Sequence, residues 1–128
     1  MLALPLFACS TVTYEGSSYE LLKGKRLQEA VVDHKFTHAY RDLVITGGCG
    51  FEAFYPNGGY RVCGDRVPFR YGSYRVFEDQ VCVSIAGNTS CWRLYTNKHG
   101  DYLIQSLPTV PGKAAASLSR VILTAFRS

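Results

Sequence analysis

The chain has 128 residues, of which 19% are charged and 13% aromatic, and its formal net charge is +4. This length fits a single domain, and the many aromatic side chains favour twisted antiparallel sheet. No run of like charges is long enough to indicate a disordered polyelectrolyte tail. The positive charge is compatible with an anionic partner, although a solvated basic surface that aids solubility is the simpler interpretation.

The first sixteen residues are predicted to lie outside the folded domain. The apolar opening ends in Leu6-Phe7-Ala8-Cys9-Ser10, which resembles the lipobox of bacterial lipoproteins, and this resemblance makes Cys9 the expected lipidation site. The alternative is that the apolar opening is only a frayed end or a first strand. The polar stretch 10–18 has the composition of a tether. We therefore expect a signal remnant and tether over 1–16 and one β domain over 17–128. No other stretch approaches the roughly 18 apolar residues of a membrane span.

A short N-terminal helix is predicted next. Ser17 to Glu20 has the spacing of a capping box, and Gly24 is a natural stop, so one or two helical turns fit between them. Leu21, Leu22 and Leu27 would pack this helix over an open end of a barrel or sheet.

Short runs with a two-residue alternation of apolar and polar side chains then follow one another, separated by turn signals. The meander from Gly72 to Trp92 is the clearest of them, and Phe36, His38 and Tyr40 also alternate. For the end of the chain, a strand and a helix starting at Ala114 are both open. The fold class is therefore mainly β, a small antiparallel meander barrel or half-barrel with one short helix. The predicted strands are Ala30–Val32, Leu43–Thr46, Phe51–Tyr55, Tyr60–Cys63, Val67–Tyr71, Tyr74–Val76, Val81–Ile85, Trp92–Thr96, Tyr102–Gln105 and Val121–Phe126.

Two disulfides are predicted from the five cysteines. A two-residue turn at Ala86-Gly87 places Cys82 directly opposite Cys91, close enough for a bridge after a small local adjustment. Cys49 and Cys63 pair mainly by exclusion. A turn at Asn57-Gly58 leaves them out of register, and a bulge in the glycine-rich stretch 47–50 would have to absorb the offset.

Catalytic and metal-binding patterns are not evident. The chain has no Cys-x-x-Cys pair, no nucleophile elbow and no phosphate-binding loop, and its carboxylates fall mostly in turns. His34 and His38 share a strand face but lie too far apart to suggest metal ligands, so we expect ordinary surface histidines. The sequence therefore predicts no enzymatic activity, no metal and no cofactor.

The aromatic and arginine side chains are the best candidates for a binding surface. We select Tyr74, Arg75, Trp92, Arg93 and Tyr95, which fall on neighbouring predicted strands. Interleaved Tyr and Arg on a sheet can bind nucleic acid, but an exported location argues against that partner. For most of the aromatic residues, packing in the core or across strands is the simpler interpretation.

Four segments form a recognisable set: Leu22–Leu27, Phe54–Tyr60, Gly72–Val76 continuing into Val81–Val83, and Ser90–Trp92. In these segments the chain resembles a group of small exported bacterial proteins without a known activity, many of which carry lipoprotein signals. The resemblance spans about Leu22 to Gln105. In that group a Gly-x-Trp motif precedes two cysteines that face each other across a hairpin, and Tyr74 replaces the tryptophan here. More distantly, the chain is similar to small periplasmic inhibitors of lysozyme, which combine a lipid anchor with a disulfide-bearing barrel.

The resemblance implies a lipocalin-like sheet in the bacterial periplasm, anchored by lipid to the outer membrane. Our first hypothesis is a non-enzymatic, envelope-anchored β domain that binds a small ligand or an envelope protein. The second is an inhibitor or accessory factor of an envelope enzyme such as lysozyme. An enclosed pocket lined by aromatic residues would favour the first hypothesis, and a rigid protruding loop the second.

Overall fold

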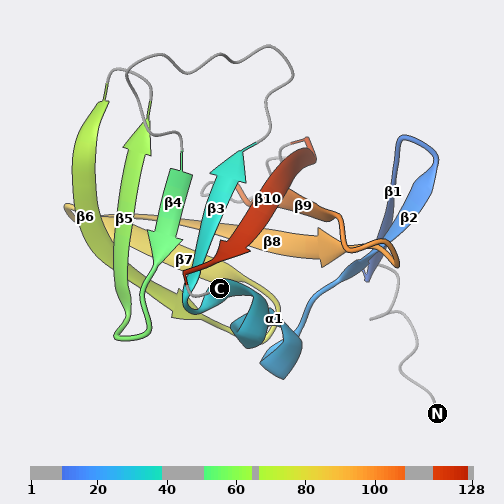
Figure 1. The fold of residues 1–128 in the computed structure, drawn as a ribbon, viewed down its shortest axis with the longest axis horizontal. Helices are drawn as coiled ribbons and strands as arrows, with labels where there is room; N and C mark the ends of the chain where they lie inside the picture. Colours follow the sequence, from blue (N-terminus) through green and yellow to red (C-terminus); the bar gives the residue numbers. More distant parts are fainter. Residues whose placement is uncertain (1–9, 39–50, 65–66, 109–116, 127–128) are drawn as a thin grey trace.

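The computed structural model describes residues 10–38, 51–64, 67–108 and 117–126, without the side chains of 63, 64, 67 and 68. This part of the chain forms one short helix and ten strands. Figure 1 shows how they are arranged. Their bounds are β1 Thr11–Tyr14, β2 Ser17–Leu21, α1 Gly24–Val31, β3 His34–His38, β4 Phe51–Phe54, β5 Gly59–Gly64, β6 Val67–Val76, β7 Val81–Ile85, β8 Asn88–Thr96, β9 Tyr102–Ser106 and β10 Ser119–Ala125.

The strands β3 to β10 form a closed antiparallel barrel. Each strand pairs with the next along the chain, β10 pairs with both β9 and β3, and β9 also pairs with β8. The ring of eight strands therefore has an up-and-down order, and the prediction of a mainly β meander barrel is confirmed. The strand prediction for the end of the chain is also confirmed by β10. The strand predicted over Leu43–Thr46 lies outside the described residues.

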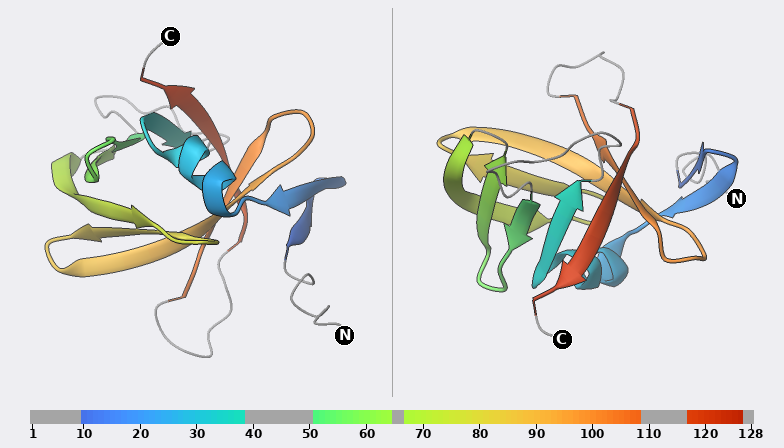
Figure 2. Two further views of the ribbon diagram at one scale, coloured as in Figure 1. Left: turned by 90° about the horizontal axis from the view of Figure 1, so that it is seen from below. Right: turned by 45° about the horizontal axis from the view of Figure 1, so that its top comes forward.

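The hairpin of β1 and β2 extends from the side of the barrel (Figure 2). β2 pairs with the last residues of β8, and Tyr19 and Leu21 pack on Tyr95 and Leu103 outside the barrel. The helix predicted from the capping-box spacing at Ser17 is therefore wrong, because alternate burial against β8 outweighs the local helix signal. The described structure also begins before residue 17, since β1 lies within the stretch predicted as a tether.

The helix α1 begins at Gly24, where the predicted helix was to end, and it replaces the predicted strand at Ala30–Val32. Leu27 and Val31 are four residues apart on one helix face and are fully buried in the barrel core. Of Leu21, Leu22 and Leu27, which were expected on a helix over an open barrel end, only Leu27 lies on α1. Leu22 precedes α1 and packs in the same core, whereas Leu21 ends β2 and lies in the cluster outside the barrel, so the expectation for Leu21 is wrong. In Figure 1, α1 lies below the ends of the strands.

β6 is one continuous strand that includes Val67–Tyr71 and Tyr74–Val76, which were predicted as separate segments. A Cβ atom at Gly72 would lie 2.0 Å from the backbone oxygen of Ser84 on the neighbouring strand. Glycine is therefore needed for the close approach of two strands and does not mark a turn.

The disulfide between Cys82 and Cys91 is confirmed. Ala86 and Gly87 both have positive φ angles, of 51° and 85°, as a two-residue hairpin turn requires. The register opposes Cys82 to Cys91 as predicted.

The register predicted for the hairpin of β4 and β5 is wrong by one residue. Phe54 opposes Tyr60, because Tyr55 belongs to the turn and its N–H donates to the backbone oxygen of Gly59. Cys63 consequently opposes Phe51. Cys49 lies outside the described residues, so its bridge to Cys63 stays a prediction.

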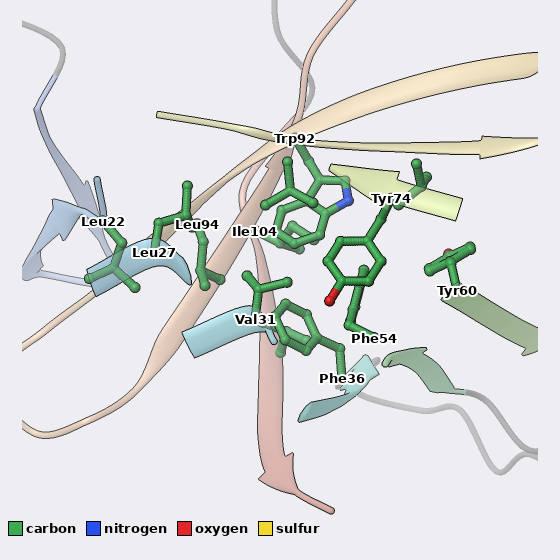
Figure 3. Packing of buried hydrophobic residues seen from close by; sticks show 13 residues of the cluster. Leu22, Leu27, Val31, Phe36, Phe54, Tyr60, Tyr74, Trp92, Leu94 and Ile104 are labelled. Carbon is green, nitrogen blue, oxygen red and sulfur yellow. The ribbon is translucent and has the colours of Figure 1, made fainter. Parts of the chain in front are cut away.

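The barrel core is dominated by aromatic rings (Figure 3). The ring centroid of Phe54 lies 4.9 Å from that of Phe36, 5.1 Å from that of Tyr74 and 5.8 Å from that of Trp92. Aliphatic side chains from α1 and β8 complete the core near the helix. Within the described residues, no helix is long and apolar enough to cross a membrane.

Candidate ligand-binding site

A cavity of about 260 Å³ lies at the end of the barrel opposite α1. The course of β3 explains the position of the cavity relative to α1. This strand begins at His34, shortly after the end of α1, and its last residue, His38, lines the cavity. This volume is close to the lower end of small-molecule sites, roughly 300 Å³. The lining residues come from seven strands and from one residue preceding β10: His38, Glu52, Tyr60, Val83, Ser90, Trp92, Ile104, Ser106, Ser117 and Ser119.

A hydrogen-bonded carboxylate is the central group of this cavity. Glu52 is only 9% exposed, and it is the one buried charged residue in the described part of the chain. The hydroxyl of Tyr60 donates to Oε1 of Glu52 at 2.5 Å, and His38 Nε2 contacts Oε2. Three neighbouring strands, β3, β4 and β5, thus bring the imidazole of His38 and the phenol of Tyr60 into contact with the carboxylate of Glu52.

Strand alternation explains why Glu52 faces inward. Glu52 and Phe54 are two residues apart on β4, and Phe54 lies in the core. The same spacing places His38 on the inner side with Phe36 on β3. A carboxylate removed from water loses hydration free energy, and the contacts with Tyr60 and His38 offset that loss only in part.

The same environment acts on the phenol. Burial raises the pKa of Tyr60 far above its usual value of 10, and the charge of Glu52 and the hydrogen bond to it raise this pKa further. Tyr60 therefore remains a neutral hydrogen-bond donor throughout the physiological pH range.

Trp92 forms part of the inner wall. It is 5% exposed, and its Nε1 is a buried donor without a hydrogen-bond partner among the described residues. Figure 3 shows the indole beside the rings of Tyr74 and Phe54. A buried donor left without an acceptor costs free energy. A ligand that accepted a hydrogen bond from this N–H would therefore bind more tightly.

A larger hollow of about 440 Å³ lies outside the barrel, between α1 and the turn that joins β8 to β9. Arg26 in its lining already forms an ion pair with Glu20, at 3.3 Å between Nη1 and Oε1. Lys98 and Gly100, also in the lining, are exposed. This hollow lacks a buried polar group of the kind that the barrel cavity has, so the barrel cavity is the stronger candidate.

The five residues selected from the sequence do not share one surface. Trp92 and Tyr74 point into the barrel, where the Tyr74 hydroxyl donates to the backbone oxygen of Tyr55 at 2.7 Å. Arg75 is exposed on the outside, and its guanidinium lies 5.7 Å from the ring centroid of Phe77. Arg93 lies 3.9 Å from Asp79, and Tyr95 is buried beneath the hairpin of β1 and β2. Only Trp92 lines the cavity.

The sequence interpretation missed Glu52 and took His38 for a surface histidine. His38 is instead 22% exposed in its side chain and contacts Glu52. A signal was present, because Glu52 and His38 each lie two residues from a phenylalanine that is buried in the core, Phe54 on β4 and Phe36 on β3. A polar residue in phase with the apolar face of a strand indicates a group on the inner side of the barrel.

No cluster of three or more metal-ligating side chains occurs in the described parts of the chain. No protein-family model, curated protein or solved structure matches the chain.

Replacing Tyr60 with phenylalanine should lower the free energy of unfolding by about 1.5 to 3 kcal/mol, because a hydrogen bond to a buried charged group is lost. Urea unfolding at neutral pH measures this. Tyr71→Phe, on the 68% exposed tyrosine of β6, is the matched control and should change stability by less than about 0.5 kcal/mol.

The pH dependence provides a second measurement. The pKa of Tyr60 is raised in the folded state. The contribution of this phenol to the free energy of unfolding is therefore complete below about pH 10. It is lost as the pH rises further, because the tyrosine then ionises in the unfolded chain. The wild-type protein should therefore lose stability more steeply above about pH 10 than Tyr60→Phe does. Equal slopes would contradict the placement of this phenol beside Glu52.

Proposed function

We propose that the protein is a non-enzymatic binding domain that takes a small ligand into the open end of its barrel. The observation that carries this proposal is the buried Glu52 carboxylate in the wall of a cavity. A well-packed apolar residue in its place would stabilise the barrel at least as well, so folding gives no reason for a charge there. Binding sites combine apolar walls with a few convergent polar groups in this way.

The lining indicates the chemistry of the ligand. Val83 and Ile104 provide apolar contacts, and four serines place hydroxyl groups around the polar part of the wall. A carboxylate has about four lone-pair positions, so Glu52 can accept from a ligand while it keeps the contacts with Tyr60 and His38. We therefore expect a small, partly apolar ligand with at least one hydrogen-bond donor, directed at Glu52.

The cavity favours this hypothesis over an inhibitor of lysozyme or of another envelope enzyme. An inhibitor would use a protruding segment as its main binding element, whereas the buried polar groups of this barrel converge on an interior volume. Both hypotheses remain compatible with a non-enzymatic role.

The single tryptophan of the chain allows a direct test. Trp92 lines the cavity, so the ¹H–¹⁵N correlation spectrum of the ¹⁵N-labelled protein has one indole N–H signal that reports on it. We expect small amines, alcohols and amides with an apolar part to shift this signal in a saturable manner during titration. Backbone amide signals of β4 and β5 should move together with it.

A variant that fills the cavity separates this binding from unspecific effects. Ser90→Phe places a ring at the cavity wall and should abolish the indole shifts, whereas Ser73→Phe, on an exposed position of β6, should leave them unchanged. Shifts that persist in a folded Ser90→Phe protein, or no shift with any compound in the wild-type protein, would overturn the proposal.

We further propose that the domain is exported and held at the outer membrane by a lipid on Cys9, which lies outside the described residues. The disulfide between Cys82 and Cys91 supports an oxidising compartment. Production of the chain behind a lipoprotein signal in a bacterial host, followed by mass spectrometry of the membrane fraction, should find an acylated N-terminal peptide. A Cys9→Ser chain should yield no acylated peptide. An unmodified Cys9 in the correctly processed protein would contradict the anchor.

A further inference from the structure

The outside of the barrel carries a second surface that the cavity does not involve. Here it is called the basic aromatic face, and it consists of Lys35, Phe51, Arg61, Phe69, Tyr71 and Phe126. It lies over β3 to β6 and the end of β10, the strands that run side by side across Figure 1. Phe69, Tyr71 and Phe126 are 48%, 68% and 39% exposed. Large apolar side chains gathered on the surface of a soluble domain indicate an interaction site.

Arg61 is the centre of this face. Its guanidinium carbon lies 4.7 Å from the ring centroid of Phe69 and 5.6 Å from that of Phe51, and Tyr71 is its partner across the strands β5 and β6. The Nζ of Lys35 lies 5.1 Å from the centroid of Phe51. The ring of Tyr55, 5.9 Å from the Arg61 guanidinium, is stacked on Phe126 and joins that residue to the face.

Among the described residues, Lys35 and Arg61 form no ion pair with a carboxylate. The Nε of Arg61 is buried without a hydrogen-bond partner there. Across β3, β4, β5, β6 and β10, Glu52 is the only acidic residue, and its side chain is inside the barrel. The basic residues of the outer surface there include Lys35 and Arg61, whereas Arg120 on β10 lies in a hollow beside Asp101. This side of the barrel is therefore complementary to a negatively charged partner.

We propose that the basic aromatic face lies on an anionic lipid bilayer. Aromatic side chains favour the boundary between water and hydrocarbon, and each Lys or Arg near an anionic surface adds attraction. Ile122, which is 57% exposed on the outside of β10, gains from an apolar phase. In this orientation the rings enter the headgroup region, and Lys35 and Arg61 reach lipid phosphates.

Two other occupants fit the observations less well. A second copy of the chain would place this cationic face against another copy of itself, with like charges opposed. Single-stranded nucleic acid needs open ring faces for base stacking, but Lys35 and Arg61 already lie over the rings of Phe51 and Phe69. An exposed isoleucine also contributes nothing to stacking.

The test uses the full chain with Cys9→Ser, so that no acyl chain contributes to binding. Flotation with vesicles of phosphatidylcholine and phosphatidylglycerol should show binding that weakens as salt is added, and vesicles of phosphatidylcholine alone should bind much less. The double variant Phe69→Ser/Tyr71→Ser should reduce the partition coefficient roughly tenfold, because two exposed rings no longer enter the membrane. Lys35→Gln should reduce it roughly fivefold through the loss of one charge.

Lys98→Gln is the matched control for Lys35→Gln, since it removes a lysine on the exposed turn between β8 and β9. Lys98→Gln should change the partition coefficient by less than twofold, because the domain binds through the basic aromatic face and not through its total charge. Circular dichroism and urea unfolding confirm that each variant is folded. Equal binding to both kinds of vesicle, or equal losses for Lys35→Gln and Lys98→Gln, would overturn the proposal. Tighter binding to a single-stranded oligonucleotide than to anionic vesicles would overturn it in favour of nucleic acid.

Discussion

Closure of the sheet into eight strands is the constraint on which the rest of this structure depends. A barrel of this size has an interior just wide enough for side chains or for one small ligand. Near α1, the interior is filled by aliphatic and aromatic side chains, with Leu27 and Val31 contributed by the helix. At the other end, smaller and polar residues leave a cavity. One barrel thus combines a packed core near α1 with a cavity at the other end, where we propose that a ligand binds.

Burial of the Glu52 carboxylate at the polar end of the barrel costs folding free energy, and the proposed function rests on this cost. Glu52 needs both Tyr60 and His38, each from a different strand, to make its burial tolerable. The disulfide joins β7 to β8, which contribute Val83 and Trp92 to the opposite wall. Barrel closure and the covalent bridge together hold both walls in place, and a ligand of the proposed kind would meet a preorganised site.

The inside and the outside of the barrel have opposite electrostatic character along the same strands. On β4, Glu52 faces inward and Phe51 outward, and on β5, Tyr60 faces inward and Arg61 outward. Alternation therefore separates an acidic interior site from a basic aromatic exterior by the thickness of one sheet. If the domain rests on an anionic membrane with this exterior, the membrane contacts the wall of the barrel. The open end of the barrel then lies beside the contact and stays accessible.

The local hairpin of Cys82 and Cys91 could be predicted from the sequence, because a two-residue turn determines which residues are opposed. The start of α1 could not, since Ser17 to Leu21 has a capping pattern and becomes a strand only through packing on Tyr95 and Leu103. Prediction of the cavity from the sequence would have required knowledge of which strands are neighbours in the barrel. Alternation alone places Glu52 and His38 on inner faces, but only the pairing of β3 with β4 brings them together.

A crystallographic fragment screen tests the central claim, that the hollow barrel end is a ligand site, most directly. Fragments with an apolar ring and a hydrogen-bond donor should be found in the cavity, in contact with Glu52 and with Trp92 or Tyr60. Crystals in which the cavity opening is not covered by a neighbouring molecule are needed for this experiment. A screen in which fragments bind only outside the barrel, with the Glu52 cavity never occupied, would contradict the account.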